Sequence, residues 1–266
     1  MSETPTHREE LPSDPAYDAF TPHPAPALWG YKDLFVFVAF AAIALGFSFA
    51  AVLLSVKALE AVTGSPIPID DGPYQLPVVL AIQFLWWAIV LLYIHRLVTE
   101  KYQLPFAEAI GWKPFKGPGL NYMSTGVLVA LSVGLLSNVL PMPDQQVPIE
   151  ELLQQPGALL LFAIFGVLVA PAIEELVFRG FLFPAIERKH GQLAAILATS
   201  ALFSGLHFSQ YGGHWAILLL LFYVGAVFGF VRARTGSIKA TTILHASYNA
   251  TFLVGLHFAQ QQGLNS

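Results

Sequence analysis

Six strongly polar side chains interrupt the long apolar stretches in the second half of this chain. They are Glu174, Glu175, Arg179, His207, His245 and Asn249. An ionised side chain at the bilayer centre costs ~2.5–3.5 kcal/mol on insertion scales, and such residues commonly mark functional sites. Carboxylates and imidazoles that meet in a dry cavity are suited to activating water, either directly as bases or through a bound metal ion.

The spacing of these residues indicates which side chains share a helix face. Residues four positions apart on a helix are neighbours, and three such pairs occur: Glu175 with Arg179, Phe203 with His207, and His245 with Asn249. We interpret Glu175 as the ion-pair partner of Arg179, which leaves Glu174 for chemistry. Pro171 lies one turn before Glu174, and its missing N–H should leave the carbonyl of Val167 without a helical donor and open the helix locally.

Other hydrolytic chemistries do not fit the sequence. There are no cysteines, so thiolate catalysis and disulfides are excluded. A presenilin-like aspartyl protease needs two aspartates inside the membrane, but the only aspartate near a predicted span is Asp33, at the end of that span. The His-Glu-x-x-His motif of site-2-type metalloproteases is absent. A dyad of Ser204 and His245 would lack the glycine that precedes the serine in rhomboid-like proteases, and it would give Glu174 no role. Activation of water by glutamate and histidine, with or without a metal, remains.

The composition predicts a membrane protein. Of 266 residues, 55% are hydrophobic and 11% are charged, against roughly 25% charged in soluble domains, and the mean hydropathy is +0.61. The net charge of −4 gives no reason to expect nucleic acid as a partner. About seven stretches are long enough to cross ~30 Å of hydrocarbon as helices: residues 33–56, 77–97, 121–140, 157–183, 192–208, 215–231 and 238–258. In the sixth, Gly225 and Gly229 indicate close helix packing.

The distribution of basic residues predicts the orientation. With the N-terminus in the cytoplasm, all 13 Lys and Arg residues except Lys57 and Arg179 fall on the inner side. Inner loops enriched in Lys and Arg are the rule for membrane proteins. We therefore expect an integral protein of the cell membrane with a cytoplasmic N-terminus and seven spans, whose site is reached from the cytoplasmic side or laterally from lipid.

The chain organisation is expected to be simple. Residues 1–30 are polar and rich in proline, which is typical of a disordered tail. Residues 31–266 then form one all-α transmembrane bundle, with no second domain and no internal repeat.

Three ordered motifs carry a resemblance to a known family. Glu174-Glu175-x-x-x-Arg179, then Phe203-x-x-x-His207, then His245-x-x-x-Asn249 resemble the motifs of the CPBP family, also called the Abi family. That family contains the CAAX proteases and bacteriocin-processing enzymes. The resemblance covers about residues 157–255, the expected catalytic core, and implies an intramembrane endopeptidase.

The resemblance also implies roles for these residues. Glu174 would be the base that activates water, and His207 would share that water. His245 and Asn249 would stabilise the oxyanion, while Glu175 and Arg179 would support the helix that presents Glu174. Family members are often labelled metalloproteases, and zinc held by Glu174, His207 and His245 is chemically reasonable; a metal-free glutamate mechanism is equally open.

The substrate implied is a peptide or protein at the lipid bilayer, either a prenylated C-terminus or a leader peptide. Two other functional classes are compatible with buried ionisable residues. One is a proton-coupled transporter that uses Glu174, His207 and His245 as a relay. The other is a non-catalytic immunity or scaffold protein that retains the fold.

Overall fold

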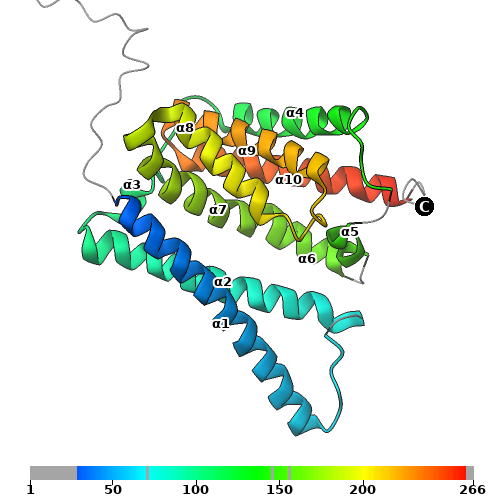
Figure 1. Ribbon diagram of the computed structural model, residues 1–266. Helices are drawn as coiled ribbons and strands as arrows, with labels where there is room; N and C mark the ends of the chain where they lie inside the picture. Colours follow the sequence, from blue (N-terminus) through cyan, green and yellow to red (C-terminus); the bar gives the residue numbers. More distant parts are fainter. Residues whose placement is uncertain (1–28, 70–71, 145–146, 155–156, 262–266) are drawn as a thin grey trace, which may run out of the picture.

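The computed structural model describes residues 29–69, 72–144, 147–154 and 157–261, and every regular element in these ranges is helical (Figure 1). Most helical boundaries fall within a few residues of the predicted stretches. The elements are α1 (Tyr31–Thr63), η1 (Gly72–Tyr74), α2 (Gln75–Arg96), η2 (Leu97–Lys101), α3 (Phe106–Ala109), α4 (Gly119–Ser137), α5 (Pro148–Leu153), α6 (Ala158–Ile164), η3 (Phe165–Val169), α7 (Ala170–Glu175), η4 (Leu176–Leu182), α8 (Phe183–Leu206), α9 (Trp215–Thr235) and α10 (Ile238–Gln261).

The predicted all-α transmembrane architecture is confirmed. Among the described residues, five helical runs are long and apolar enough to cross a membrane. The longest of them, Ala158–Leu206, breaks at Gly191, where a φ of 81° interrupts α8. A glycine tolerates this left-handed backbone at little steric cost. With that run counted as two segments and α10 added, the architecture is roughly consistent with the predicted seven spans.

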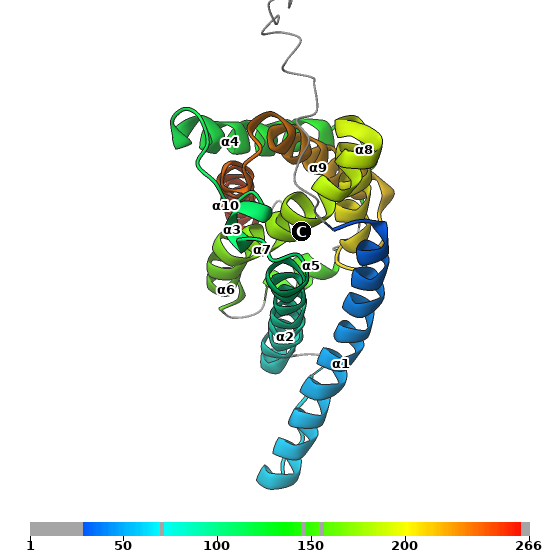
Figure 2. The same ribbon diagram turned by 90° about the vertical axis from the view of Figure 1, so that its left-hand side faces the viewer.

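The C-terminal helices form a packed bundle, and the first two helices lie beside it. Within the bundle α4 packs along α10 and α8 along α9, while α1 packs mainly on α2. Both views show α1 extending past the rest of the bundle at its C-terminal end (Figures 1 and 2). The glycines of α9 allow the close packing expected of them, because a Cβ at Gly225 would meet Ser200 at 3.1 Å and one at Gly229 would meet Ile196 at 3.4 Å.

One end of the molecule is tied together by hydrogen bonds between distant segments. Trp29 is fully buried, and its indole Nε1 donates to the carbonyl of Phe181 at 2.7 Å. At the start of α1, Asp33 accepts from Lys101 and from Tyr102, each at 2.5 Å. The predicted disordered tail falls on residues 1–30, of which 1–28 lie outside the described residues.

Candidate functional site

The helix that carries the two glutamates is locally opened on both sides. α7 ends at Glu175 and lies between η3 and η4, two π-helical stretches in which N–H groups bond five residues back. Such stretches are rare and occur frequently at functional sites. The opening that Pro171 was expected to cause is therefore present, and a second one follows at η4.

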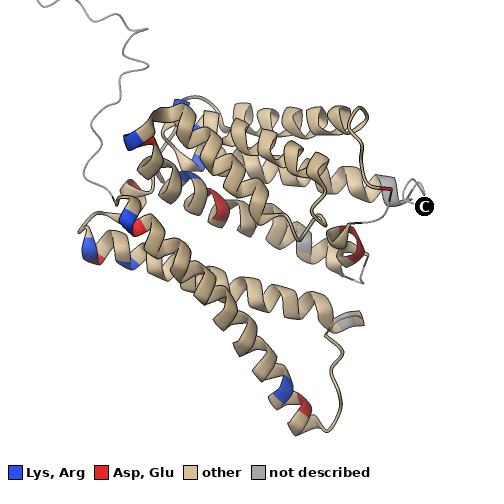
Figure 3. Ribbon diagram, in the orientation of Figure 1, with Lys and Arg blue, Asp and Glu red and all other residues tan. Residues whose placement is uncertain are grey.

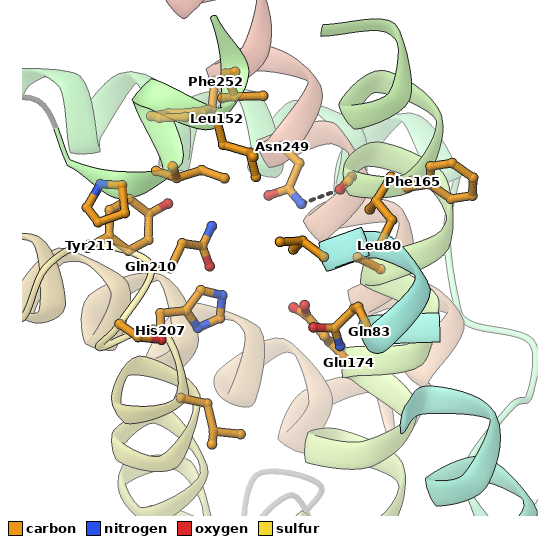
Figure 4. A pocket seen from close by; sticks show the side chains of 18 of the residues that line it. Leu80, Gln83, Leu152, Phe165, Glu174, His207, Gln210, Tyr211, Asn249 and Phe252 are labelled. Atoms are coloured by element: carbon orange, nitrogen blue, oxygen red, sulfur yellow. Dashed lines mark hydrogen bonds between the residues drawn. The ribbon is translucent and has the colours of Figure 1, made fainter. Parts of the chain in front are cut away.

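Asn249 repairs the backbone defect that Pro171 creates. In η3 the N–H of Ala170 bonds to the carbonyl of Phe165, so the next donor in this register would be Pro171, which has none. The carbonyl left over is that of Gly166, one residue earlier than the α-helical register predicts. The Nδ2 group of Asn249 donates to it at 2.6 Å (Figure 4). The role expected for Asn249 was at the oxyanion, whereas here its amide donor is engaged by the helix.

Glu175 and Arg179 form the predicted ion pair inside the protein. Glu175 Oε1 accepts from Arg179 Nη1 at 3.0 Å, and both side chains are fully buried. Arg179 Nη2 also donates to the carbonyl of Gly225 at 2.8 Å. Three aromatic rings, those of Phe178, Phe203 and Phe228, lie 5.2–5.6 Å from the guanidinium, within the range of cation–π attraction.

His245 lies between the two glutamates. Its Nδ1 is 3.1 Å from Glu175 Oε1, and its Nε2 is 3.7 Å from Glu174 Oε2. A carboxylate only accepts hydrogen bonds, so the first contact places the proton on Nδ1 and leaves Nε2 facing Glu174. Glu175 thus fixes both the tautomer of His245 and the position of Arg179. The spacing along the chain predicted its contact with Arg179 but not its contact with His245.

His207 is held in a comparable way on the opposite side. It follows α8, and its Nδ1 is 2.7 Å from the carbonyl of Phe203, so that nitrogen carries the proton. Its ring also contacts the Phe203 ring, with centroids 4.7 Å apart. The Nε2 atom is left for the cavity. Phe203 therefore positions the histidine through both its backbone and its ring, as their shared helix face predicts.

These groups line one cavity of about 460 Å³. Glu174, His207, His245 and Asn249 all contribute to its wall, whereas Glu175 and Arg179 lie behind it. Figure 4 shows Glu174 and His207 facing each other across the open space. Glu174 is the acidic residue among the lining positions, and its side chain remains 22% exposed. The four residues expected to act together are thus brought to one cavity from three segments of the chain.

The cavity also contains residues that sequence reasoning missed. Gln83 of α2 and Tyr211 in the 207–214 loop line it, together with apolar residues of α5. Gln83 is the one side-chain amide in the apolar part of its predicted span, a signal that could have singled it out. Burial raises the pKa of Tyr211 to about 12, with the carboxylates of Glu174 and Glu150 adding to the shift. The tyrosine hydroxyl is therefore protonated at neutral pH and can donate.

The set Glu174, His207 and His245 does not fit a closed metal site in this arrangement. Within the described ranges, no group of three or more His, Cys, Asp or Glu side chains is close enough to hold an ion. A zinc ion requires ligand atoms within about 2.0–2.3 Å of one centre, and the cavity separates His207 from Glu174 (Figure 4). We therefore derive no step through a metal.

Comparison with known proteins identifies the C-terminal helices. A family model described as type II CAAX prenyl endopeptidase Rce1-like matches residues 156–251, from the start of α6 into α10. This segment contains all three motifs and all six of the strongly polar residues singled out in the sequence. Neither the curated proteins nor the solved structures gave a match. The match confirms the resemblance seen in the motifs over residues 156–251 and supports assignment of this segment to the CPBP family, which contains the CAAX proteases.

Proposed function

We propose that this protein is an intramembrane endopeptidase in which Glu174 activates a water molecule for attack on a peptide bond. The observation that carries the proposal is the meeting of Glu174, His207 and His245 at one apolar cavity. A carboxylate and two imidazoles in such a cavity provide the acceptors that a general-base reaction on water requires.

The residues have distinct parts in this reaction. Water held between the Glu174 carboxylate and His207 Nε2 loses a proton to Glu174 as its oxygen attacks the substrate carbonyl. The tetrahedral intermediate then collapses, the C–N bond breaks, and the protonated Glu174 returns the proton to the leaving amine. His245 lies beside Glu174, with its Nε2 atom 3.7 Å from Glu174 Oε2, and Glu175 holds the His245 ring in place.

The oxyanion needs hydrogen-bond donors that remain protonated at neutral pH. Gln83 and Tyr211 supply such donors on the cavity wall. Asn249 was expected in this role, but its amide group is the partner of the Gly166 carbonyl. We assign Asn249 to holding open the helix that presents Glu174, and Gln83 and Tyr211 to the oxyanion.

The proposal takes the metal-free form of the mechanism. Its support is the separation of His207 from Glu174 across the cavity, together with the two imidazole Nδ1 atoms already engaged by protein acceptors. Glu174 then acts as the base itself, with no requirement for a Lewis acid.

The test compares wild-type protein with Glu174→Gln, which keeps the shape of the side chain and removes its basicity. Membranes from cells carrying each protein are analysed by mass spectrometry for peptides that accumulate uncleaved. In parallel, the purified proteins in detergent are given a farnesylated CAAX peptide and a leader peptide. Cleavage of the test peptides by the wild-type protein but not by Glu174→Gln supports the proposal. Equal cleavage by the two proteins refutes it.

A further inference from the structure

The cavity lies toward the end of the bundle that carries α5 and the 207–214 loop, and most of the basic residues lie at the other end. Its wall is made by the first half of α2, by α5, by the start of α6, by η3 and α7, by the end of α8 with the 207–214 loop, and by the middle of α10. In Figure 3, most of the Lys and Arg residues gather around α3 and the start of α8, away from α5; Lys57, near the C-terminal end of α1, is an exception. The residues of this basic end are Lys32, Arg96, Lys101, Lys113, Lys116, Arg188, Lys189, Arg232, Arg234 and Lys239.

The protein is closed between the cavity and the basic end. The chain that follows Glu174 toward Arg188 is packed with large buried residues, including Phe178, Phe181 and Phe183, which are 0–4% exposed. Arg179 crosses this layer to reach Gly225, and Arg232 Nε donates to the Arg179 carbonyl at 2.9 Å. A peptide cannot pass through a layer packed at this density without unfolding it.

The rim of the cavity is acidic. The N–H of Ile149 in α5 donates to the carbonyl of Gln210 at 3.2 Å, which joins α5 to the 207–214 loop. α5 carries Glu150 and Glu151, and none of the described residues that line the cavity is Lys or Arg. A free α-carboxylate drawn into this apolar space would find no cation to pair with, and an unpaired buried charge is strongly disfavoured.

We propose that the site takes its substrate from the non-cytoplasmic side, as an internal apolar peptide segment flanked by neutral or cationic residues. This inference rests on the proposed function. Loops rich in Lys and Arg face the cytoplasm, so the open, acidic end of the cavity faces the other compartment. The sequence had led us to expect cytoplasmic or lateral access, because the motifs alone do not show which end of the site is closed.

The natural absence of cysteine allows a direct test of sidedness. Single variants Ser209→Cys and Glu151→Cys mark the rim, and Lys189→Cys marks the basic end; all three side chains are exposed. Each is treated with a membrane-impermeant maleimide in right-side-out and in inside-out vesicles. We expect the rim positions to react only in right-side-out vesicles and Lys189→Cys only in inside-out vesicles. The reverse pattern overturns the proposal.

A second measurement tests the substrate class. Quenched-fluorescence peptides with one apolar core, an amidated C-terminus and either Lys or Glu flanks are added to both kinds of vesicle. We expect cleavage in right-side-out vesicles, several-fold faster with Lys flanks at low salt, and none with Glu174→Gln. Cleavage confined to inside-out vesicles, or a preference for Glu flanks, contradicts the proposal. If neither vesicle cleaves any peptide, the proposed function fails, whereas the labelling pattern still decides the side of access.

Discussion

Two adjacent glutamates should respond very differently to the same substitution. Glu175→Gln leaves Arg179 without its counter-charge in a fully buried position and weakens the acceptor of His245 Nδ1. Removal of one partner from a buried ion pair typically costs about 3–5 kcal/mol, because the remaining charge stays desolvated. For a chain of this size, that loss corresponds to a fall in melting temperature of roughly 6–20 °C.

Glu174→Gln should change stability little and activity greatly. The Glu174 side chain is 22% exposed, and its closest charged contact is His245 Nε2 at 3.7 Å, longer than a hydrogen bond. We therefore expect a cost of about 1 kcal/mol or less in the free energy of unfolding. Peptide cleavage should nevertheless fall below detection, because glutamine cannot accept the proton of the attacking water.

Thermal unfolding of the purified variants in detergent, together with cleavage of a quenched peptide, separates these effects. Glu100→Gln is a suitable control, since its pair with Arg96 is exposed and such pairs contribute about 0–1 kcal/mol. The double variant Glu175→Gln/Arg179→Met should be more stable than Glu175→Gln alone, because it leaves no unpaired charge. Equal melting temperatures for the two single variants, or full cleavage by Glu174→Gln, would refute the assignment of a structural and a catalytic glutamate.

Three further outcomes follow from the contacts around the cavity. Asn249→Leu should lower the free energy of unfolding by about 1–3 kcal/mol, because it leaves the Gly166 carbonyl without a donor. The loss should be smaller in a Pro171→Ala background, where a backbone N–H becomes available. Equal losses in both backgrounds, measured by thermal unfolding, would argue against the hydrogen bond from Asn249 as the replacement for the missing Pro171 donor. Gln83→Leu should lower kcat by about 10²-fold or more if the amide binds the oxyanion, with an unchanged melting temperature; a change confined to KM would assign Gln83 to substrate binding instead. Chelation should leave cleavage by the purified protein intact, with less than one metal ion per chain by elemental analysis, whereas loss of activity that zinc restores would favour the metal mechanism.

The local chemistry of the motif helix was predictable because it depends on short distances along the chain. Residues four apart on a helix are neighbours whatever the rest of the protein does, so the pair of Glu175 with Arg179 and the contact of Phe203 with His207 could be read from spacing. Likewise, the position of Pro171 predicted an opening before Glu174, although the π-helical register moved the affected carbonyl from Val167 to Gly166.

The contacts between helices were not predictable in the same way. The hydrophobicity of a segment indicates that it crosses the bilayer as a helix. A helix that is apolar on every side carries little information about which neighbouring helix each face contacts. The contact of His245 with Glu175, that of Asn249 with Gly166, and the presence of Gln83 in the cavity all join segments 70 or more residues apart.

The sequence by itself determined that this is a helical membrane protein whose C-terminal segment carries the CPBP-type motifs, with few strongly polar side chains inside the predicted spans. Composition, hydrophobic run length and motif order are properties of the chain, and they survive any change in how the helices pack. The spacing already separated the roles of Glu174 and Glu175, but only the tertiary structure decided which partner holds each histidine and which residues far apart in the chain line the cavity with Glu174. These depend on the rotation and depth of each helix against its neighbours, which are fixed by packing between residues far apart in the sequence.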